Sequence, residues 1–351
     1  MTRGSGVVAP DWTATPVVLA PMAGGPGTVD LAAAVAAAGG FAFLPGAYLT
    51  PGRLRADVRA LRARTRAPFG VNLFAPSPDG PALLTAAREY AARLAPWAAA
   101  AGVVLGEARW DDDAFGAKVE VLLEEAPAVV SFAFAWPPAE VVTRLQRAGT
   151  QVWVTVNEPE EVAWAEALGV DGLVAQGWEA GGHRGGPVDT GREQPPLLSL
   201  LAALRERTDL PVVAAGGLAT GADAARALEA GAVAAAFGTA FLSCPEAGTS
   251  EVHRHALAHR SGTTVTRAFT GRSARALRTA WTDGYGEAAP AAYPHVHHVT
   301  APLRAHGRAT GEADLVHLWA GTGHARTRSL PAGELCRLLV EELRATRSSP
   351  G

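Results

Sequence analysis

The sequence has few of the features that mark secreted, membrane-spanning or nucleic-acid-binding proteins. It contains only two cysteines, Cys244 and Cys336, which are far apart and lack metal-site spacing, so we expect no disulfide and no metal. The 31 basic and 34 acidic residues nearly balance, which argues against a nucleic-acid partner. The apolar stretch 32–40 is too short for a membrane span, which takes about 18 residues or more. We therefore expect a soluble, cytoplasmic protein that acts on a small molecule.

Two common catalytic motifs are also missing. No Gly-x-Ser-x-Gly elbow is present, and Cys244 has no motif-level partner, so a hydrolase is disfavoured. The Walker phosphate-binding pattern is absent as well. Any phosphate site in this chain must therefore be built differently.

Up to residue 243 the chain alternates between short apolar runs and helical segments. The predicted strands cover residues 17–20, 41–44, 69–74, 128–134, 152–156, 171–175, 211–215 and 233–237. Strands that are apolar on both faces and separated by helices indicate a parallel sheet, and eight of them predict a closed (β/α)8 TIM barrel. An open doubly wound sheet is the alternative, but it carries its Gly-rich fingerprint early and rarely reaches eight units.

The strand–helix period is lost after residue 243. We expect an N-terminal leader (1–15), a barrel (16–243), a helical appendage or lid (244–329) and a C-terminal helix (330–351). Within the lid the pattern predicts helices over 246–259 and 272–281, and a loop rich in His and Pro over 290–302.

One glycine-rich loop, Gln176–Gly186, follows the sixth predicted strand and contains His183. Glycines let the backbone approach a ligand closely, and His183 is the one side chain of the loop that titrates near neutral pH. A candidate for proton transfer and a flexible, solvated turn are both compatible with this loop taken alone.

Further glycines end the seventh and eighth predicted strands, at Gly216–Gly217 and at Gly238–Thr239. In barrels these two positions commonly bind phosphate through backbone N–H groups. Asn72 and Gln176 are amides where a purely structural barrel has aliphatic side chains. They fit either the edge of a planar cofactor or hydrogen bonds to loop backbone.

Other histidines are weaker candidates. His253, His255 and His259 share a predicted helix, where a solvated face is favoured over a metal site. His295, His297 and His298 lie in the predicted loop and could face either ligand or water.

Several segments together make the chain resemble the nitronate monooxygenase family, formerly the 2-nitropropane dioxygenases. They are Ala20–Gly25, Pro68–Phe74, Gln176–Gly185, Ala215–Gly217, Phe237–Thr239, Gly271–Arg275, Ala292–Pro294 and Leu318–Gly321. The Glu-Ala-Gly-Gly-His-Arg-Gly sequence within the third segment is the most specific. The segments cover nearly the whole chain in the family's order.

The resemblance implies a barrel that holds FMN noncovalently, with a helical region closing over the flavin ring. It implies that Met22 meets the flavin through its backbone, that Asn72 and Gln176 bond its polar edge, and that His183 is the catalytic base. Tyr293 is expected in the substrate pocket. The resemblance implies that Gly181, Gly217, Gly238 and Thr239 hold the phosphate side. Ala236 and Phe237 are expected to bind the cofactor as well, although Ala236 stands where the family often has Gln.

The implied reaction is oxidation of an alkyl nitronate, such as propionate 3-nitronate, or of a nitroalkane, by O2 to a carbonyl compound and nitrite. An NAD(P)H-dependent FMN oxidoreductase, either a quinone reductase or an enoyl-acyl carrier protein reductase, is the second expectation. A non-catalytic flavin-binding sensor is a third. The sequence does not determine the oligomeric state.

Overall fold

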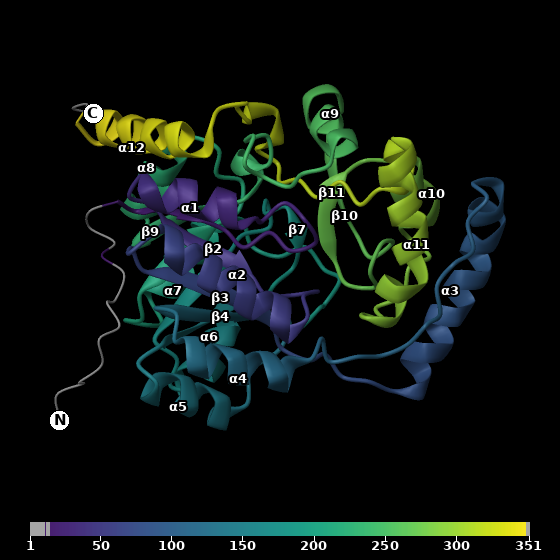
Figure 1. Cartoon of the computed structure of the whole chain (residues 1–351), viewed down its shortest axis with the longest axis horizontal. Coiled ribbons are helices and arrows are strands. Elements are labelled where there is room, and N and C mark those ends of the chain that lie inside the picture. Colours follow the sequence, from purple (N-terminus) through teal and green to yellow (C-terminus); the bar gives the residue numbers. More distant parts are fainter. Residues whose placement is uncertain (1–10, 12–14, 349–351) are drawn as a thin grey trace.

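The computed structural model describes residue 11 and residues 15–348, so most of the expected leader lies outside the described residues. Eight parallel strands form a closed barrel in the order β1-β2-β3-β4-β5-β6-β8-β9. The TIM-barrel prediction is therefore confirmed (Figure 1). The barrel strands are β1 (Val17–Leu19), β2 (Phe41–Pro45), β3 (Phe69–Phe74), β4 (Val129–Ala133), β5 (Gln151–Val156), β6 (Gly172–Gln176), β8 (Val212–Ala215) and β9 (Ala234–Phe237).

The barrel closes between its first and last strands, where Leu19 of β1 is in register with Phe237 of β9. Large aromatic side chains fill the barrel interior below the carboxyl ends of the strands, among them Phe41, Phe43 and Trp153. A second apolar layer packs between the outer faces of the strands and the surrounding helices. The barrel interior is thus a packed core, and only the end of the barrel at the carboxyl ends of the strands is free to bind a ligand.

Helices surround the barrel, and some of them begin directly after threonine side chains that cap them. Thr28 caps the first helix by accepting a hydrogen bond from Leu31 N–H (3.0 Å), and Thr220 forms a capping box with Asp223. The surrounding helices are α1 (Val29–Ala37), α2 (Pro51–Arg64), α4 (Phe115–Glu125), α5 (Ala139–Arg147), α6 (Val162–Ala167), α7 (Leu197–Arg205), α8 (Gly221–Glu229) and α12 (Ala332–Ser348).

The C-terminal helix α12 belongs to the barrel rather than to the lid. It packs between α8 and α1, which is the position of the eighth barrel helix (Figure 1). The residues between β9 and α12 are therefore an insertion into the last strand–helix unit.

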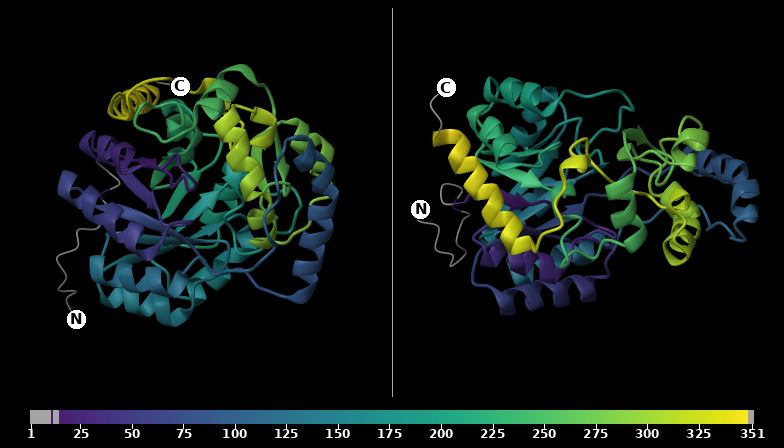
Figure 2. Two further views of the ribbon diagram at one scale, coloured as in Figure 1. Left: turned by 45° about the vertical axis from the view of Figure 1, so that its right-hand side comes forward. Right: turned by 90° about the horizontal axis from the view of Figure 1, so that it is seen from above.

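A second body packs at the carboxyl ends of the strands (Figure 2). We call residues 81–100 and 244–331 the lid, because α3 (Pro81–Ala100) packs against α11 (His295–Thr310) and shares an apolar core with it. The lid also contains α9 (Glu251–His259), α10 (Ala280–Tyr285), β10 (Thr263–Thr266) and β11 (Ala274–Leu277). None of the helices in the described part of the chain combines the length and the apolar character needed to cross a membrane.

Two predictions for the lid were wrong. Residues 272–281, predicted as a helix, contain strand β11, which pairs antiparallel with both β10 and the short strand β7 (Gly182–His183). Residues 290–302, predicted as a loop, contain the first half of α11. The lid is therefore a mixed structure, and its three-stranded sheet reaches into the glycine-rich loop of the barrel.

Pro302 explains why the sequence does not predict the first half of α11. A proline inside a helix cannot donate to the carbonyl four residues earlier, here that of His298. The backbone of Gly106 covers this point: its N–H donates to Val299 O (2.9 Å), and a Cβ on Gly106 would lie 2.2 Å from His298 O. The loop 107–113 follows this contact directly.

We expect Gly221→Ala to destabilise the protein, because it would force α12 away from α8. A Cβ at this position would lie 2.3 Å from both Leu339 O and Leu343 N, which are backbone atoms that cannot rotate away. Overpacking of this kind costs about 1–3 kcal/mol. Chemical denaturation measures the free energy of unfolding. Gly284→Ala in α10, where a Cβ meets nothing within 4 Å, is the matched control and should not destabilise. Equal stability of the two variants would contradict this packing.

Candidate active site

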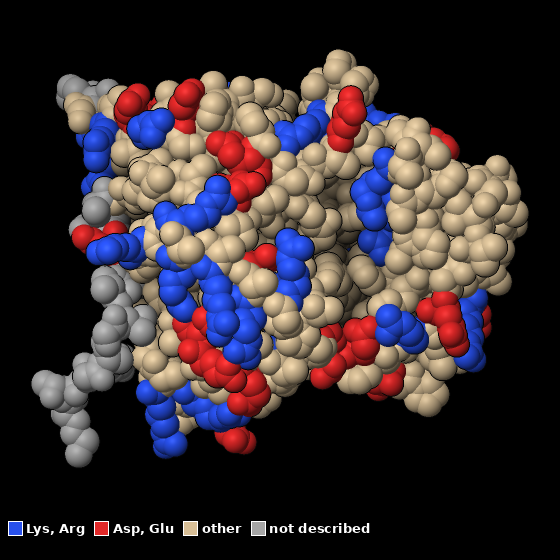
Figure 3. All heavy atoms as spheres, viewed as in Figure 1, with Lys and Arg blue, Asp and Glu red and all other residues tan. Residues whose placement is uncertain are grey.

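A cavity of about 430 Å³ opens at the carboxyl ends of the barrel strands, beneath the lid. In Figure 3 a hollow separates barrel and lid, with basic side chains along its lid-side border. The cavity lining contains these residues proposed from the sequence: Met22, Asn72, Gln176, Gly181, His183, Gly217, Ala236, Gly238 and Thr239. Segments spread over more than 200 residues therefore meet at one site, as the barrel topology predicts.

His183 is held by a strand rather than by a flexible turn. Gly182 and His183 form β7, and His183 is in register with Ala274 of β11. The imidazole Nε2 lies 2.8 Å from Thr270 Oγ1, and Thr270 itself is buried. No described residue bonds Nδ1, so the ring is fixed through one nitrogen and the other remains available.

The environment of His183 favours its neutral form. Burial, assisted by the positive charges of Arg272 and Arg304, lowers the pKa of His183 to about 3. Aromatic rings of Phe134 and Trp319 flank the imidazole, with centroids 5.2 and 5.1 Å away. At neutral pH the side chain therefore carries no proton on one nitrogen and can accept one.

Buried arginines brace the loop that carries His183, and they do so by bonding its backbone. Arg184 donates to the carbonyls of Gly177 (2.9 Å) and Gln176 (2.8 Å), while Arg275 donates to Trp178 O through two nitrogens. Arg272 donates to Arg184 O (2.9 Å) and to Gly186 O. None of these three arginines forms an ion pair with a carboxylate in the described ranges.

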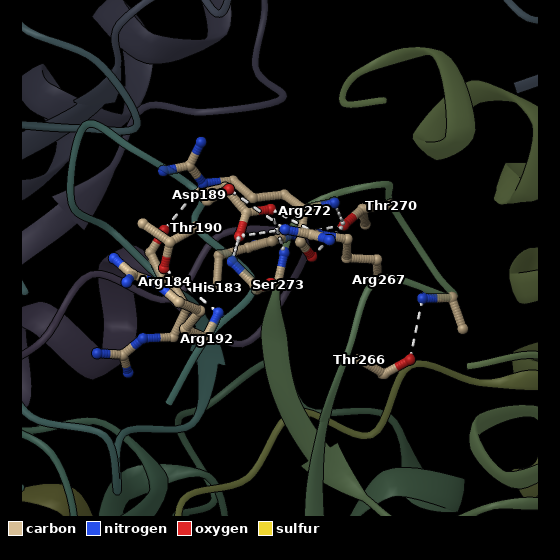
Figure 4. Close-up of polar contacts among 12 residues, drawn as sticks. His183, Arg184, Asp189, Thr190, Arg192, Thr266, Arg267, Thr270, Arg272 and Ser273 are labelled. Atoms are coloured by element: carbon tan, nitrogen blue, oxygen red, sulfur yellow. Dashed lines mark hydrogen bonds and ion pairs between the residues drawn. The ribbon is translucent and has the colours of Figure 1, made fainter. Parts of the chain in front are cut away.

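An outer ion pair extends the same bracing. Asp189 bonds the guanidinium of Arg267 and accepts from Ser273 N–H (3.0 Å), so it ties the end of the loop to the lid (Figure 4). These bonds hold the pKa of Asp189 down at about 2, against the effect of its burial. The loop is thus fixed at both ends by lid residues.

Gln176 bonds mainly to protein backbone. Its Nε2 donates to His183 O (3.0 Å), and its Oε1 accepts from Gly185 N–H (2.8 Å) and from Asn157 Nδ2 (2.9 Å). Gln176 therefore shapes the loop from within, and one of its N–H groups remains for a ligand. Of the two roles considered for Gln176, hydrogen bonding within the protein accounts for its oxygen and for one of its two N–H groups.

Asn72 keeps more of its capacity open. Its Nδ2 donates to Ser131 Oγ (3.0 Å) and Ser131 O (3.2 Å), and no described residue donates to its Oδ1. The side chain lines the cavity, so a ligand with an N–H group at its edge would find an acceptor here.

Glycines form one wall of the cavity, and at two of them the structure disfavours a side chain. A Cβ on Gly181 would lie 2.4 Å from Gly321 N, and Gly217 has a φ of +71°. No described residue accepts from the N–H groups of Gly217 and Gly238. Thr239 Oγ1 accepts from Gly321 N–H (3.0 Å), which joins this wall to the lid. Unpaired N–H groups of this kind suit an anion such as phosphate.

The remaining residues proposed from the sequence differ in how they lie relative to the cavity. They are Met22, Phe237 and Tyr293. Met22 lines the cavity, and its carbonyl accepts from Gly27 N–H (2.8 Å). No described residue accepts from the N–H of Met22. Phe237 is fully buried in the layer between strands and helices, so only its backbone can serve a ligand. Tyr293 does not line the cavity, but its hydroxyl lies 3.4 Å from that of Tyr48, which does.

Several lining residues were missed or undervalued from the sequence, namely Tyr48, His253, Thr270, His297, Arg304, Arg308, His317 and Trp319. The solvated interpretation is right for His255, which is exposed, but wrong for His253, which is buried and bonds Trp319 O (3.0 Å). The spacing of these histidines could not reveal this, because it does not show which face of the helix packs against the rest of the protein. His297 lines the cavity, whereas His295 and His298 lie beside Asp79 and Asp111.

Nearly the whole chain is similar to known proteins of one family. Residues 11–342 match the sequence profile of the family described as Nitronate monooxygenase. The chain is similar to a nitronate monooxygenase of Pseudomonas aeruginosa, at 42% identity over 342 residues, which covers 94% of this chain and 96% of that relative.

Solved structures with a similar fold also match nearly the whole chain. The fold is similar to that of nitroalkane oxidase from Streptomyces ansochromogenes, with a TM-score of 0.92 and 46% identity over 95% of this chain and 97% of that one. It is also similar to FabK from Thermotoga maritima, with a TM-score of 0.74 and 26% identity over 95% and 94% of the two chains.

Buried histidines should make the protein less stable in mild acid. Burial lowers the pKa of His253 to about 4, below the ordinary value of about 6.5. The unfolded chain then binds a proton that the folded chain does not, so stability falls as the pH drops from about 6.5 towards 4. Thermal melts between pH 7 and pH 4.5 test this. His253→Gln should reduce the loss, and His255→Gln, an exposed position on the same helix, should not; identical pH slopes for both would count against it.

Proposed function

The chain belongs to the nitronate monooxygenase family, and from this premise we propose that it binds FMN and oxidises alkyl nitronates with O2 to a carbonyl compound and nitrite. The family is flavin-dependent, and the protein is an oxidoreductase. The observation that carries the proposal is His183, which is fixed on a strand beside a glycine-walled cavity.

The residues around the cavity fit FMN. The N–H groups of Gly217 and Gly238, with the hydroxyl of Thr239, would hold the phosphate at the ends of β8 and β9. Asn72 Oδ1, the remaining N–H of Gln176 and the N–H of Met22 would meet the polar atoms of the ring. When bound, FMN would supply an acceptor for the electrons of the substrate and a donor of electrons to oxygen.

The protein contributes orientation and one proton transfer. A nitroalkane must lose a carbon-bound proton before it is a nitronate. In the tautomer in which His183 Nε2 donates to Thr270 Oγ1, Nδ1 has no proton and can accept the one from the substrate. Thr270 holds the opposite nitrogen, so the ring cannot turn away. A nitronate is already deprotonated and does not need this step.

The direct test is a visible spectrum of the purified protein, followed by anaerobic addition of a nitronate. We expect a flavin spectrum that bleaches with nitronate, and O2 uptake with nitrite release in air. Oxidation of NADH with a quinone, without a reaction with nitronate, would favour the reductase alternative. A flavin that neither nitronate nor NADH reduces would indicate a sensor. Absence of a flavin spectrum after reconstitution with FMN would overturn the proposal.

His183→Asn should separate the two substrate forms. Without the base, kcat/KM for a neutral nitroalkane should fall by roughly 10²–10⁴, the range that general-base catalysis provides. With the preformed nitronate the loss should be much smaller. Oxygen uptake with nitroethane and with its nitronate measures both. Equal losses on the two forms would contradict the base role.

A further inference from the structure

The cavity is electrostatically one-sided. None of its described lining residues is Asp or Glu, and the two charged lining side chains are Arg304 and Arg308, both on α11 of the lid. A closed pocket with cationic groups and no carboxylates attracts anions. The glycine wall at β8 and β9 accounts for one anion, the phosphate, but the arginines lie on a different element.

Arg304 is buried and lacks a counterion. Only 5% of its surface is exposed, and no described carboxylate forms an ion pair with it. Its Nε donates to Thr300 Oγ1 (3.1 Å), and its Nη2 donates to His297 O (2.8 Å) and lies 3.2 Å from His297 Nδ1. Nη1 has no partner among the described residues. Burial lowers the pKa of Arg304 to about 10, so the group remains protonated at neutral pH.

This position adjoins the proposed proton acceptor. His297, which Arg304 bonds, stacks on Tyr48 with ring centroids 4.5 Å apart. Tyr293 lies between the two sides, with its ring 6.3 Å from that of His297 and 6.1 Å from that of His183. Arg308 is one helical turn further along α11 and is exposed, so it lies at the rim of the cavity. His183, His297 and Arg304 line the same cavity, so the space beside His183 continues to Arg304.

We propose that Arg304, with Arg308 at the rim, forms an oxyanion subsite for the substrate. This inference rests on the proposed function. Nitronate and carboxylate groups are both planar and carry two oxygens, which matches the fork of a guanidinium. The anion is either the nitronate group itself or a carboxylate at the other end of the substrate, and the two sources are distinguishable by experiment.

The test compares two nitronates of similar shape on the FMN-loaded enzyme and its Arg304→Gln variant. Propionate 3-nitronate carries a carboxylate, and the nitronate of 3-methyl-1-nitrobutane carries an isopropyl group in its place. If Arg304 binds the carboxylate, KM should rise at least roughly ten-fold for the first substrate only. If it binds the nitronate group, KM should rise for both. Unchanged KM for both would overturn the subsite.

Further variants and a binding measurement keep the outcome interpretable. Arg304→Lys keeps the charge and should recover part of the loss, whereas Arg344→Gln, on the exposed side of α12, should change nothing. Arg308→Gln tests the subsite if the buried variant does not fold. Titration of the oxidised holoprotein with propionate, followed by its visible spectrum, reports anion binding without turnover. This titration tests whether the subsite exists even if the wild-type protein fails to oxidise nitronates. Loss of propionate binding only in the Arg304 variants would support the subsite.

Discussion

Hydrogen bonds from buried guanidinium groups to backbone carbonyls hold the glycine-rich loop Gln176–Gly186 in shape. A chain segment with five glycines loses much conformational entropy on folding and has few side chains with which to hold itself. Arg184, Arg272 and Arg275 supply the missing contacts by donating to carbonyls of this loop. Because Arg272 and Arg275 come from around β11, the loop is ordered only when the lid sheet is in place. The position of His183 therefore depends on the lid as much as on the barrel.

One of these arginines also affects the electrostatics of the site. Burial is the main cause that disfavours a proton on His183, and the positive charges of Arg272 and of Arg304 on the lid add to it. A neutral imidazole next to cationic groups is a weak base while the site contains no anion. A negatively charged ligand nearby would raise its pKa, because opposite charges favour the protonated form. An anion bound in this cavity would thus make His183 a stronger base.

The sequence predicts the barrel well because its strands are apolar on both faces and its helices begin at capping residues such as Thr28 and Thr220. The chain-order pattern also brought Asn72, His183 and Thr239 to one end of the barrel. It could not predict β11, since alternating Ala and Arg have no strand character until Arg275 finds the carbonyl of Trp178. Arg304 escaped notice for a related reason: a basic residue on a helix reads as solvent-exposed, and only tertiary packing buries it.

The insertion of the lid before α12 has a consequence for the order in which the chain folds during synthesis. The eighth barrel helix leaves the ribosome after the whole lid, so the barrel cannot be completed while the lid is still being made. Until then the apolar faces of α8 and α1 that α12 covers are open to water. The nascent chain must therefore assemble its ligand-covering body on an unfinished barrel. A helix none of whose described residues lines the cavity therefore completes the barrel last.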